Sequence, residues 1–360
     1  MKNNILHTDF KLNGNSFGSE IDLLHFTKKH LNSGFLFLSE WFDDSDFVTV
    51  STSGSTGKPK PMKLKKEFMI NSAKATGDFF DLKEGTTALL CLPIKYIAGK
   101  MMLVRAMVLG WHIDVIESNS FPLKGITKKY DFSAMVPLQL FNSLTEIGKI
   151  KKLIVGGGAV SNELQLKIMD LSTKMYATYG MTETITHIAI KPLNKSSMQG
   201  VTTGQSLHSY TTLPNIKITT DNRNCLVIEA PRVAEGEVVT NDLVEIISNK
   251  QFKWLGRYDH IINSGGIKLI PEQIEEKLSA VIDCRFFITG LPDDILGEKL
   301  VLILEIQNSK FEIENLKDKL KKLETLAKYE VPKKIYLVKW FVETETKKIH
   351  RKKTLDLVNQ

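Results

Sequence analysis

Two spacings of apolar residues alternate along the first half of the chain. Residues 64–80 and 98–109 carry apolar side chains at helical spacing, whereas residues 87–92 and 151–155 are short apolar runs typical of buried strands. Strands that alternate with helices indicate βαβ units and a largely parallel sheet. The same criteria predict strands at 47–51, 112–116, 132–136 and 174–178, and a helix after Ser161, whose hydroxyl can cap its first turn.

The pattern changes in the second half of the chain. Between about 205 and 256, short strands separated by turn residues predict a β-rich subdomain, and residues 257–360 predict a compact α+β domain with a helix from Pro271. The predicted fold class is therefore α/β. A large N-terminal domain (1–256) holds parallel-rich sheets, helices and the β-rich subdomain, and a small C-terminal domain follows. The strands predicted within the subdomain are 216–218, 226–229, 237–240 and 243–247.

Composition places the chain among ordinary globular proteins. It has 360 residues, of which 42% are hydrophobic and 25% charged, enough for a large core in two or three domains. No apolar run approaches the roughly 20 residues that span a bilayer, and no signal peptide is apparent at the N-terminus. Three scattered cysteines without a CxxC pair are typical of a reducing compartment. We predict a cytoplasmic protein without membrane insertion.

The net charge of +7 raises the question of nucleic-acid binding. The lysines are dispersed or concentrated near the C-terminus, at 317–322 and 347–353, without interleaved aromatic residues. Solvated helix faces explain this distribution better than a nucleic-acid surface does, because no groove-reading module accompanies them. A small polyanion would benefit from the same positive field.

The most informative segment is Thr52–Lys60, which follows the predicted strand 47–51. Glycine-rich backbone exposes consecutive N–H groups as an anion-binding nest, and hydroxyls and lysines add donors. A Walker A loop would need glycine at Thr52 and a hydroxyl residue at Pro59, so the segment predicts a different triphosphate cradle, although such a sequence can also form a plain surface turn. Its proposed nucleotide-binding residues are Thr52, Ser53, Gly54, Ser55, Thr56, Gly57 and Lys60.

A second motif, Tyr179-Gly-Met-Thr-Glu183, follows a predicted parallel strand, where ligands of α/β sheets bind. Together the two motifs resemble those of the adenylate-forming superfamily, which includes acyl- and aryl-CoA ligases. The resemblance implies that Tyr179 stacks on adenine beside Gly180, that Thr182 contacts the α-phosphate and that Glu183 holds Mg²⁺. A carboxylate oxygen suits Mg²⁺, but capping of a helix would also explain this glutamate.

Three further segments resemble elements of the same superfamily. The glycine-rich turn Gly156–Ala159 would lie against adenine through Gly157 and Gly158. The segment Thr240–Leu243 would place the Asp242 carboxylate on the ribose hydroxyls, with Asn241 in place of the usual glycine. The long segment Gly256–Glu275 resembles the signature that joins the two domains. There Arg257 would bind ribose or phosphate, Asp259 would be the hinge, and Gly265 and Gly266 would border the pantetheine tunnel, while Glu272 and Glu275 would be helix-surface residues.

The last motif, Thr346–Arg351, resembles the terminal element that carries the catalytic lysine. Lys348 would then bridge the carboxylate and α-phosphate oxygens and stabilise the charge that develops during adenylation. Lys347 and His350 depart from the family pattern. A basic surface segment without a catalytic role is the alternative.

The segment Leu92–Met107 resembles the acyl-tunnel segment of o-succinylbenzoate–CoA ligases. A substrate with a second carboxylate needs a cation or hydrogen-bond donors for that group. Tyr96 would gate the tunnel, and the candidate cations are Lys95, Lys100 and Arg105, although each is equally consistent with an amphipathic helix surface.

The resemblance implies an enzyme that uses ATP, Mg²⁺ and coenzyme A. It would convert an aromatic dicarboxylic acid, o-succinylbenzoate in menaquinone biosynthesis, to an acyl-AMP and then to a CoA thioester, with the small domain pivoting between the two steps. The alternatives are another aryl- or short acyl-CoA synthetase, an adenylation domain that loads a carrier protein, or a basic nucleic-acid-binding protein. A homodimer is a possible assembly.

Overall fold

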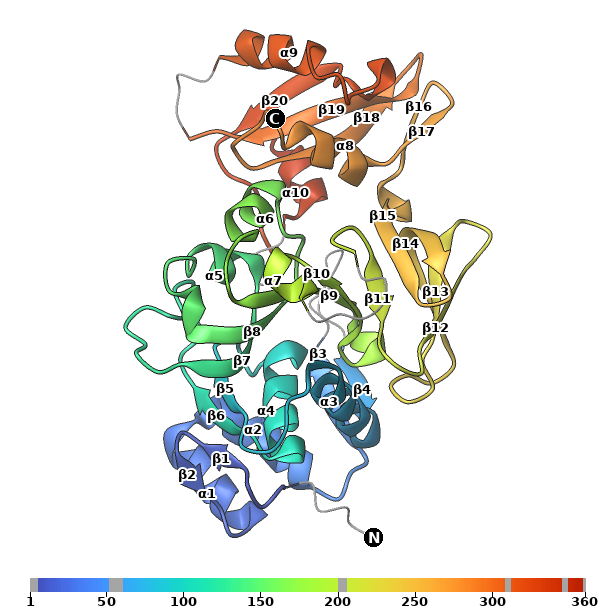
Figure 1. The fold of residues 1–360 in the computed structure, drawn as a ribbon. Helices are drawn as coiled ribbons and strands as arrows, with labels where there is room; N and C mark the ends of the chain where they lie inside the picture. Colours follow the sequence, from blue (N-terminus) through green and yellow to red (C-terminus); the bar gives the residue numbers. More distant parts are fainter. Residues whose placement is uncertain (1–5, 52–60, 200–205, 308–311, 345–348, 359–360) are drawn as a thin grey trace.

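A computed structural model describes residues 6–51, 61–199, 206–307, 312–344 and 349–358. Figure 1 shows a large lower part, built from the first two thirds of the chain, and a smaller part above it. The predicted cradle at 52–60 and Lys348 lie outside the described residues.

The larger part is organised around one sheet whose described strands run in the order β12-β13-β14-β15-β11-β10-β9-β8-β7-β5-β6-β1-β2. The stretch from β9 to β1 is parallel throughout, as the alternation of strands and helices predicts. Its strands, with their antiparallel neighbours, are β1 (Lys11–Leu12), β2 (Asn15–Ser16), β5 (Thr87–Leu90), β6 (His112–Val115), β7 (Tyr130–Met135), β8 (Ile150–Val155), β9 (Lys174–Gly180) and β10 (His187–Pro192).

Helices cover both faces of the parallel region (Figure 1). Successive strand residues point to opposite faces, so Leu153 belongs to one hydrophobic cluster and Ile154 to the other. The cluster of Ile154 includes Met69 and Met102, and the cluster of Leu153 includes Leu164. The helices are α1 (Glu20–His30), α2 (Asn32–Phe42), α3 (Lys66–Phe80), α4 (Ile97–Leu109), α5 (Pro137–Phe141), α6 (Asn162–Ile168), whose predicted cap Ser161 is confirmed, and α7 (Lys195–Met198), with a 3-10 turn η1 (Ile147–Lys149).

The β-rich region extends the main sheet instead of forming a separate one. β10 pairs antiparallel with β11, which in turn pairs with β15. The prediction of two strands at 237–240 and 243–247 was wrong, because β14 runs without interruption and absorbs the polar pair Asn241–Asp242 through a register shift near Leu243. The strands are β11 (Tyr210–Thr212), β12 (Lys217–Thr220), β13 (Cys225–Glu229), β14 (Glu237–Ser248) and β15 (Gln251–Arg257).

A separate two-stranded sheet flanks the predicted cradle. It consists of β3 (Phe47–Ser51) and β4 (Pro61–Lys65), with Val48 opposite Leu64. The helix predicted from residue 64 begins instead at Lys66, because the alternating residues before it pair with β3.

The smaller part has its own five-stranded sheet and apolar cores, which include Leu302 and Phe287. Its elements are β16 (Ile262–Ser264), β17 (Ile267–Leu269), α8 (Pro271–Leu278), β18 (Phe286–Asp293), β19 (Gly297–Glu305), α9 (Ile313–Lys321), β20 (Lys334–Val338) and α10 (Arg351–Asp356), with 3-10 turns η3 (Tyr258–His260) and η4 (Lys328–Glu330). These features confirm the predicted α/β fold class. No helix in the described part of the chain is both long and apolar enough to cross a membrane.

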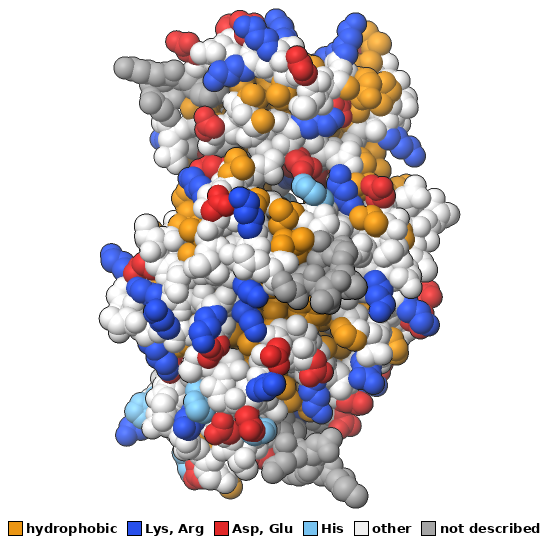
Figure 2. Space-filling model, viewed as in Figure 1, with side chains coloured by type: hydrophobic (Ala, Val, Ile, Leu, Met, Phe, Trp, Pro, Cys, Tyr) orange, Lys and Arg blue, Asp and Glu red, His pale blue; other side chains and the backbone are white. Residues whose placement is uncertain are grey.

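One side chain links α6 of the larger part to α8 of the smaller part. Asn162 Nδ2 donates to the Glu276 carbonyl at 3.1 Å and to Ser279 Oγ at 2.7 Å. Figure 2 shows the constriction between the two parts, where side chains of both charges gather.

Candidate active site

Three of the predicted motifs, those that contain Tyr179, Asp242 and Arg257, meet where β9, β14 and β15 lie close together. Asp242 in β14 lies opposite Arg257 in β15, and the Tyr179 hydroxyl at the end of β9 donates to Asp242 Oδ2 at 2.6 Å. Segments that are 63 residues apart in the sequence are thus joined by one hydrogen bond.

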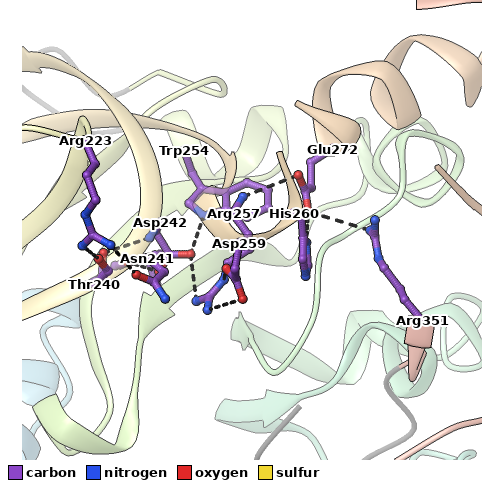
Figure 3. A network of polar contacts seen from close by, with 11 residues as sticks. Arg223, Thr240, Asn241, Asp242, Trp254, Arg257, Asp259, His260, Glu272 and Arg351 are labelled. Carbon is purple, nitrogen blue, oxygen red and sulfur yellow. Dashed lines mark hydrogen bonds and ion pairs between the residues drawn. The ribbon is translucent and has the colours of Figure 1, made fainter. Parts of the chain in front are cut away.

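The Asp242 carboxylate is buried and receives three donors. Besides Tyr179, Trp254 Nε1 donates to Oδ1 at 3.1 Å, and Arg257 Nη1 lies 3.4 Å from the same oxygen (Figure 3). The Asp242 backbone N–H also donates to the Thr240 hydroxyl. This arrangement fixes the carboxylate in one orientation, because both oxygens are held by groups of other strands.

The Tyr179 ring packs in an aromatic cluster. It lies edge-on to Phe252, with ring centroids 5.1 Å apart, and 5.7 Å from Tyr210. Burial and then the neighbouring Asp242 charge raise the pKa of the Tyr179 phenol, so the hydroxyl stays a donor at neutral pH. The cluster anchors one ring that the resemblance assigns to adenine stacking.

Arg257 begins a chain of charged contacts that leads into the smaller part (Figure 3). Its Nε donates to Asp259 at 3.0 Å, and its backbone N–H lies 3.5 Å from Glu272 Oε2. The other Glu272 oxygen pairs with His260 Nδ1 at 2.5 Å and lies 3.8 Å from Arg351 Nη2. The predicted hinge residue therefore lies within a network of charges at the junction.

The view of Glu272 and Glu275 as surface residues was wrong. Only 10% of the Glu272 side chain and 20% of the Glu275 side chain are exposed, and Arg351 Nη2 donates to Glu275 at 3.0 Å. Burial alone would raise the pKa of Glu272, but the hydrogen bond from His260 and the Arg351 charge lower it. Gly256 has φ +153°, and a Cβ at this residue would lie 2.5 Å from both Glu272 Oε2 and Ile270 Cγ2, so a larger residue would disturb this contact.

The chain makes an unusual turn directly after Glu183. Thr182–Thr184 form a 3-10 turn, η2, and the buried Ile185 then has φ 66° and ψ −65°, with the Thr186 N–H donating to the Thr184 carbonyl at 2.7 Å. This γ-turn is rare and strained for a β-branched residue. It leaves Glu183 exposed and directs Thr186 toward α3 and α4.

Arg105, on α4, is a buried cation beside this turn. It is 2% exposed, and its Nε and Nη2 donate to the hydroxyls of Thr76 and Thr186, each at 3.2 Å. Burial lowers its pKa to about 10. Among the described residues, no carboxylate pairs with it, which is unusual for a buried arginine.

His187 lies against the same group. Its Nδ1 is 3.3 Å from Thr186 Oγ1, and its buried Nε2 has no hydrogen-bond partner among the described residues. Burial, and then the Arg105 charge, lower the pKa of His187 to about 3, so the ring is neutral. Within the described part of the chain, a guanidinium without a carboxylate partner thus lies beside a neutral imidazole whose Nε2 has no hydrogen-bond partner.

The other predicted acid-binding residues have different neighbours. Lys100 is also buried, but its Nζ lies 4.6 Å from the ring centroid of Phe37 on α2, away from the Thr186 hydroxyl. Burial lowers its pKa. Lys95 is exposed and lies 5.4 Å from the centroid of the Tyr96 ring, just before α4. The structure therefore brings only Arg105 of the three cations to the turn after Glu183.

The backbone geometry explains why glycine occupies several positions of the predicted motifs. A Cβ at Gly180 would lie 2.0 Å from the Thr186 carbonyl oxygen, and Gly265 and Gly266 have φ of +60° and +81° in the turn between β16 and β17. Gly157 has φ +81° after β8, followed by Gly158. Their roles toward ligands stay predictions.

Glu183 fits the predicted metal contact chemically. Its carboxylate is exposed, and among the described residues no ion pair occupies it. Mg²⁺ in nucleotide sites is commonly held by one or two carboxylates, with phosphate and water completing its shell. A dedicated all-protein metal cluster is not found in the described ranges.

Sequence reasoning did not single out Trp254, His187, Thr186 or Thr76. Trp254 lies outside the strands that the sequence predicts, and the two threonines carry no motif. His187 lies four residues after Glu183, and this proximity to a motif was the one available signal.

Comparison with known proteins agrees with the motifs. A family model described as AMP-binding enzyme matches residues 29–240, more than half of the chain. A probable 2-succinylbenzoate–CoA ligase of Mycobacterium tuberculosis is 29% identical over 296 residues, which cover 76% of this chain and 74% of that protein. A 2-succinylbenzoate–CoA ligase of Staphylococcus aureus is 26% identical over 96% of this chain and 75% of its own.

Solved structures give the same picture. An acyl-CoA synthetase (AMP-forming)/AMP-acid ligase II-like protein from Dyadobacter fermentans is 38% identical, with a TM-score of 0.59 over 93% of this chain and 97% of that one. The fold also matches o-succinylbenzoate CoA synthetase (MenE) from Bacillus subtilis, at 21% identity and a TM-score of 0.73 over 84% and 68% of the two chains. The predicted superfamily is thus confirmed: the chain belongs to the AMP-binding enzyme family and is an AMP-forming ligase.

Proposed function

We propose that this enzyme is an acid–CoA ligase that converts o-succinylbenzoate to its CoA thioester through an acyl-AMP. The observation that carries the choice of acid is Arg105, a buried guanidinium without a carboxylate partner among the described residues. A buried charge of this kind is costly unless a ligand pairs with it. The carboxylate of the diacid that does not react with ATP would pair with Arg105.

The position of Arg105 fits this role. Its hydrogen-bond partner Thr186 lies three residues after Glu183, so the distal carboxylate would bind close to the reacting end of the acid. The relatives named as succinylbenzoate ligases support the same substrate. Lys95, Lys100 and Tyr96 would then line or close other parts of the acyl tunnel.

The first half-reaction would proceed at the ATP α-phosphorus. A carboxylate oxygen of the acid attacks it, a P–O bond forms, and pyrophosphate leaves. Thr182 and Lys348 would hold the α-phosphate oxygens, Thr52–Lys60 the outer phosphates, and Asp242 the ribose. Mg²⁺, held by Glu183, would neutralise phosphate charge.

In the second half-reaction, the CoA thiolate attacks the acyl carbonyl and AMP leaves. For this step we retain the division into domains 1–256 and 257–360, with Asp259 as the hinge. Rotation would withdraw Lys348 and present Gly265 and Gly266 to the pantetheine arm. The charge network around Asp259 and Glu272 lies where such a rotation would occur.

The test is a pyrophosphate-release assay that compares two acids. o-Succinylbenzoate should be activated, whereas 4-oxo-4-phenylbutanoate, which lacks only the ring carboxylate, should react poorly. Arg105→Met should lower kcat/KM for o-succinylbenzoate about 100-fold, a loss of about 2.7 kcal/mol, which is the range for losing one charge-assisted contact. The same variant should leave the value for 4-oxo-4-phenylbutanoate nearly unchanged.

Equal losses for both acids would exclude Arg105 as the distal-carboxylate partner. Activation of other aryl or short acyl acids in preference to o-succinylbenzoate would favour a different acyl-CoA synthetase. AMP release that depends on a carrier protein instead of CoA would indicate a carrier-loading enzyme.

A further inference from the structure

The Asp242 carboxylate has more donors than a ribose acceptor can retain. A carboxylate offers about four lone-pair positions. In the structure Tyr179 uses one on Oδ2, and Trp254 and Arg257 share Oδ1. A ribose with two neighbouring hydroxyls needs two positions, one on each oxygen if both hydroxyls donate to the same carboxylate.

The three donors differ in how firmly they are held. Tyr179 and Trp254 donate at 2.6 and 3.1 Å from packed aromatic rings, whereas Arg257 lies 3.4 Å away and has a second partner in Asp259 at 3.0 Å. Arg257 is therefore the donor that a ligand can replace at least cost. Once it withdraws, one donor and one free lone pair remain on each oxygen.

We propose that Trp254 is a positioning residue for ribose recognition. Its indole N–H fixes Oδ1 as the Tyr179 hydroxyl fixes Oδ2, so that the Asp242 carboxylate presents one lone pair to each of the two neighbouring hydroxyls of a ribonucleotide. Trp254 thereby favours ribonucleotides over deoxyribonucleotides without contacting the nucleotide itself.

The strand geometry supports this role for Trp254. The ring packs on the main hydrophobic cluster from the same face of β15 as Phe252, while its N–H reaches Asp242 in the neighbouring strand (Figure 3). A phenylalanine at this position would retain the packing and lose the donor. The substitution Trp254→Phe therefore distinguishes a role of the indole N–H in positioning Asp242 from a role of the ring in core packing.

The experiment uses the full chain and nucleotide alone, so it rests on the proposed ribose site of Asp242 and not on the acid. Isothermal titration calorimetry gives Kd for MgATP, 2′-deoxy-ATP and 3′-deoxy-ATP. The wild-type protein should bind at least one deoxynucleotide ten times or more weakly than ATP. Trp254→Phe should weaken ATP binding about five- to tenfold and that deoxynucleotide less than twofold, so the ratio of the two Kd values shrinks.

The matched control is Trp340→Phe, the same substitution at a residue that is 58% exposed in the smaller part. It should leave all three Kd values unchanged. If Trp254→Phe weakens the three nucleotides equally, the residue serves only packing and the inference is overturned. It is also overturned if the wild-type protein does not discriminate against either deoxynucleotide. Failure of o-succinylbenzoate as a substrate would leave the inference standing, because no acid enters the experiment.

Discussion

Two buried charges of opposite sign lie near the same motif, and the chain compensates them differently. Asp242 is surrounded by three donors, one of them the Arg257 guanidinium. Arg105 contacts two threonine hydroxyls and a methionine sulfur, but no carboxylate among the described residues. The fold thus neutralises and orients the Asp242 carboxylate, which we propose as the ribose acceptor, before any ligand binds. For Arg105 the described residues supply only hydroxyl and sulfur partners, and we propose that a substrate carboxylate neutralises its charge.

This contrast predicts opposite effects on stability, and they are the largest that we expect. Asp242→Ala should lower the free energy of unfolding by about 2–4 kcal/mol, because it leaves buried donors without an acceptor. Arg105→Met should leave it unchanged or raise it, because an apolar side chain of similar length removes an uncompensated charge. Urea denaturation of both variants without substrate measures the difference. A large loss for Arg105→Met would mean that the fold depends on this charge.

The Arg105 region should also make stability depend on pH. The pKa of His187 is about 3 in the folded protein, against about 6.5 unfolded, so between these values the unfolded chain binds more protons. The stabilising effect of a neutral His187 is complete above pH 6.5 and is lost as the pH falls. Below pH 6.5 the free energy of unfolding should fall by up to about 1.4 kcal/mol per pH unit, which amounts to about 2 kcal/mol at pH 5.

The measurement compares wild type with His187→Gln by urea denaturation at pH 7 and pH 5. The variant should lose less stability on acidification, because glutamine does not titrate. Identical losses in the two proteins would show that His187 binds protons equally in the folded and unfolded chain, and they would contradict the lowered pKa of this residue.

The smallest effect is expected at Lys100, the other buried cation of α4. Its ammonium lies over the Phe37 ring and not beside Thr186, so Lys100→Met should change KM for o-succinylbenzoate less than threefold. Arg105→Met, assayed in parallel, supplies the contrast. If KM increased more for Lys100→Met than for Arg105→Met, the distal carboxylate would bind on the Lys100 side of α4, and our proposal would be wrong.

Much of the fold follows from local patterns. The parallel strands and the helix capped by Ser161 each depend on neighbouring residues, so the sequence predicts them. The continuous β14 was not predicted, because Asn241 and Asp242 have turn propensity and only pairing with β13 and β15 overrides it.

The candidate site divides in the same way. Asp242 and Arg257 were found because each lies in a contiguous motif. Trp254 and His187 were not, because their roles come from contacts made after folding: an indole N–H that reaches the neighbouring strand, and a ring buried against α4. Such contacts leave no local signature, and only their polar atoms in an apolar setting identify them.

The link through Asn162 has a consequence for how the enzyme could turn over. Both of its hydrogen bonds are at least partly accessible to solvent, so water can replace them at a cost of about 1–3 kcal/mol. If no other contact held the two parts together, both Asn162 hydrogen bonds would be broken in roughly one molecule in 5 to one in 150. Departure of the smaller sheet from α6 would then need no unfolding of either core, and the ion pairs near β15 would be further contacts to rearrange.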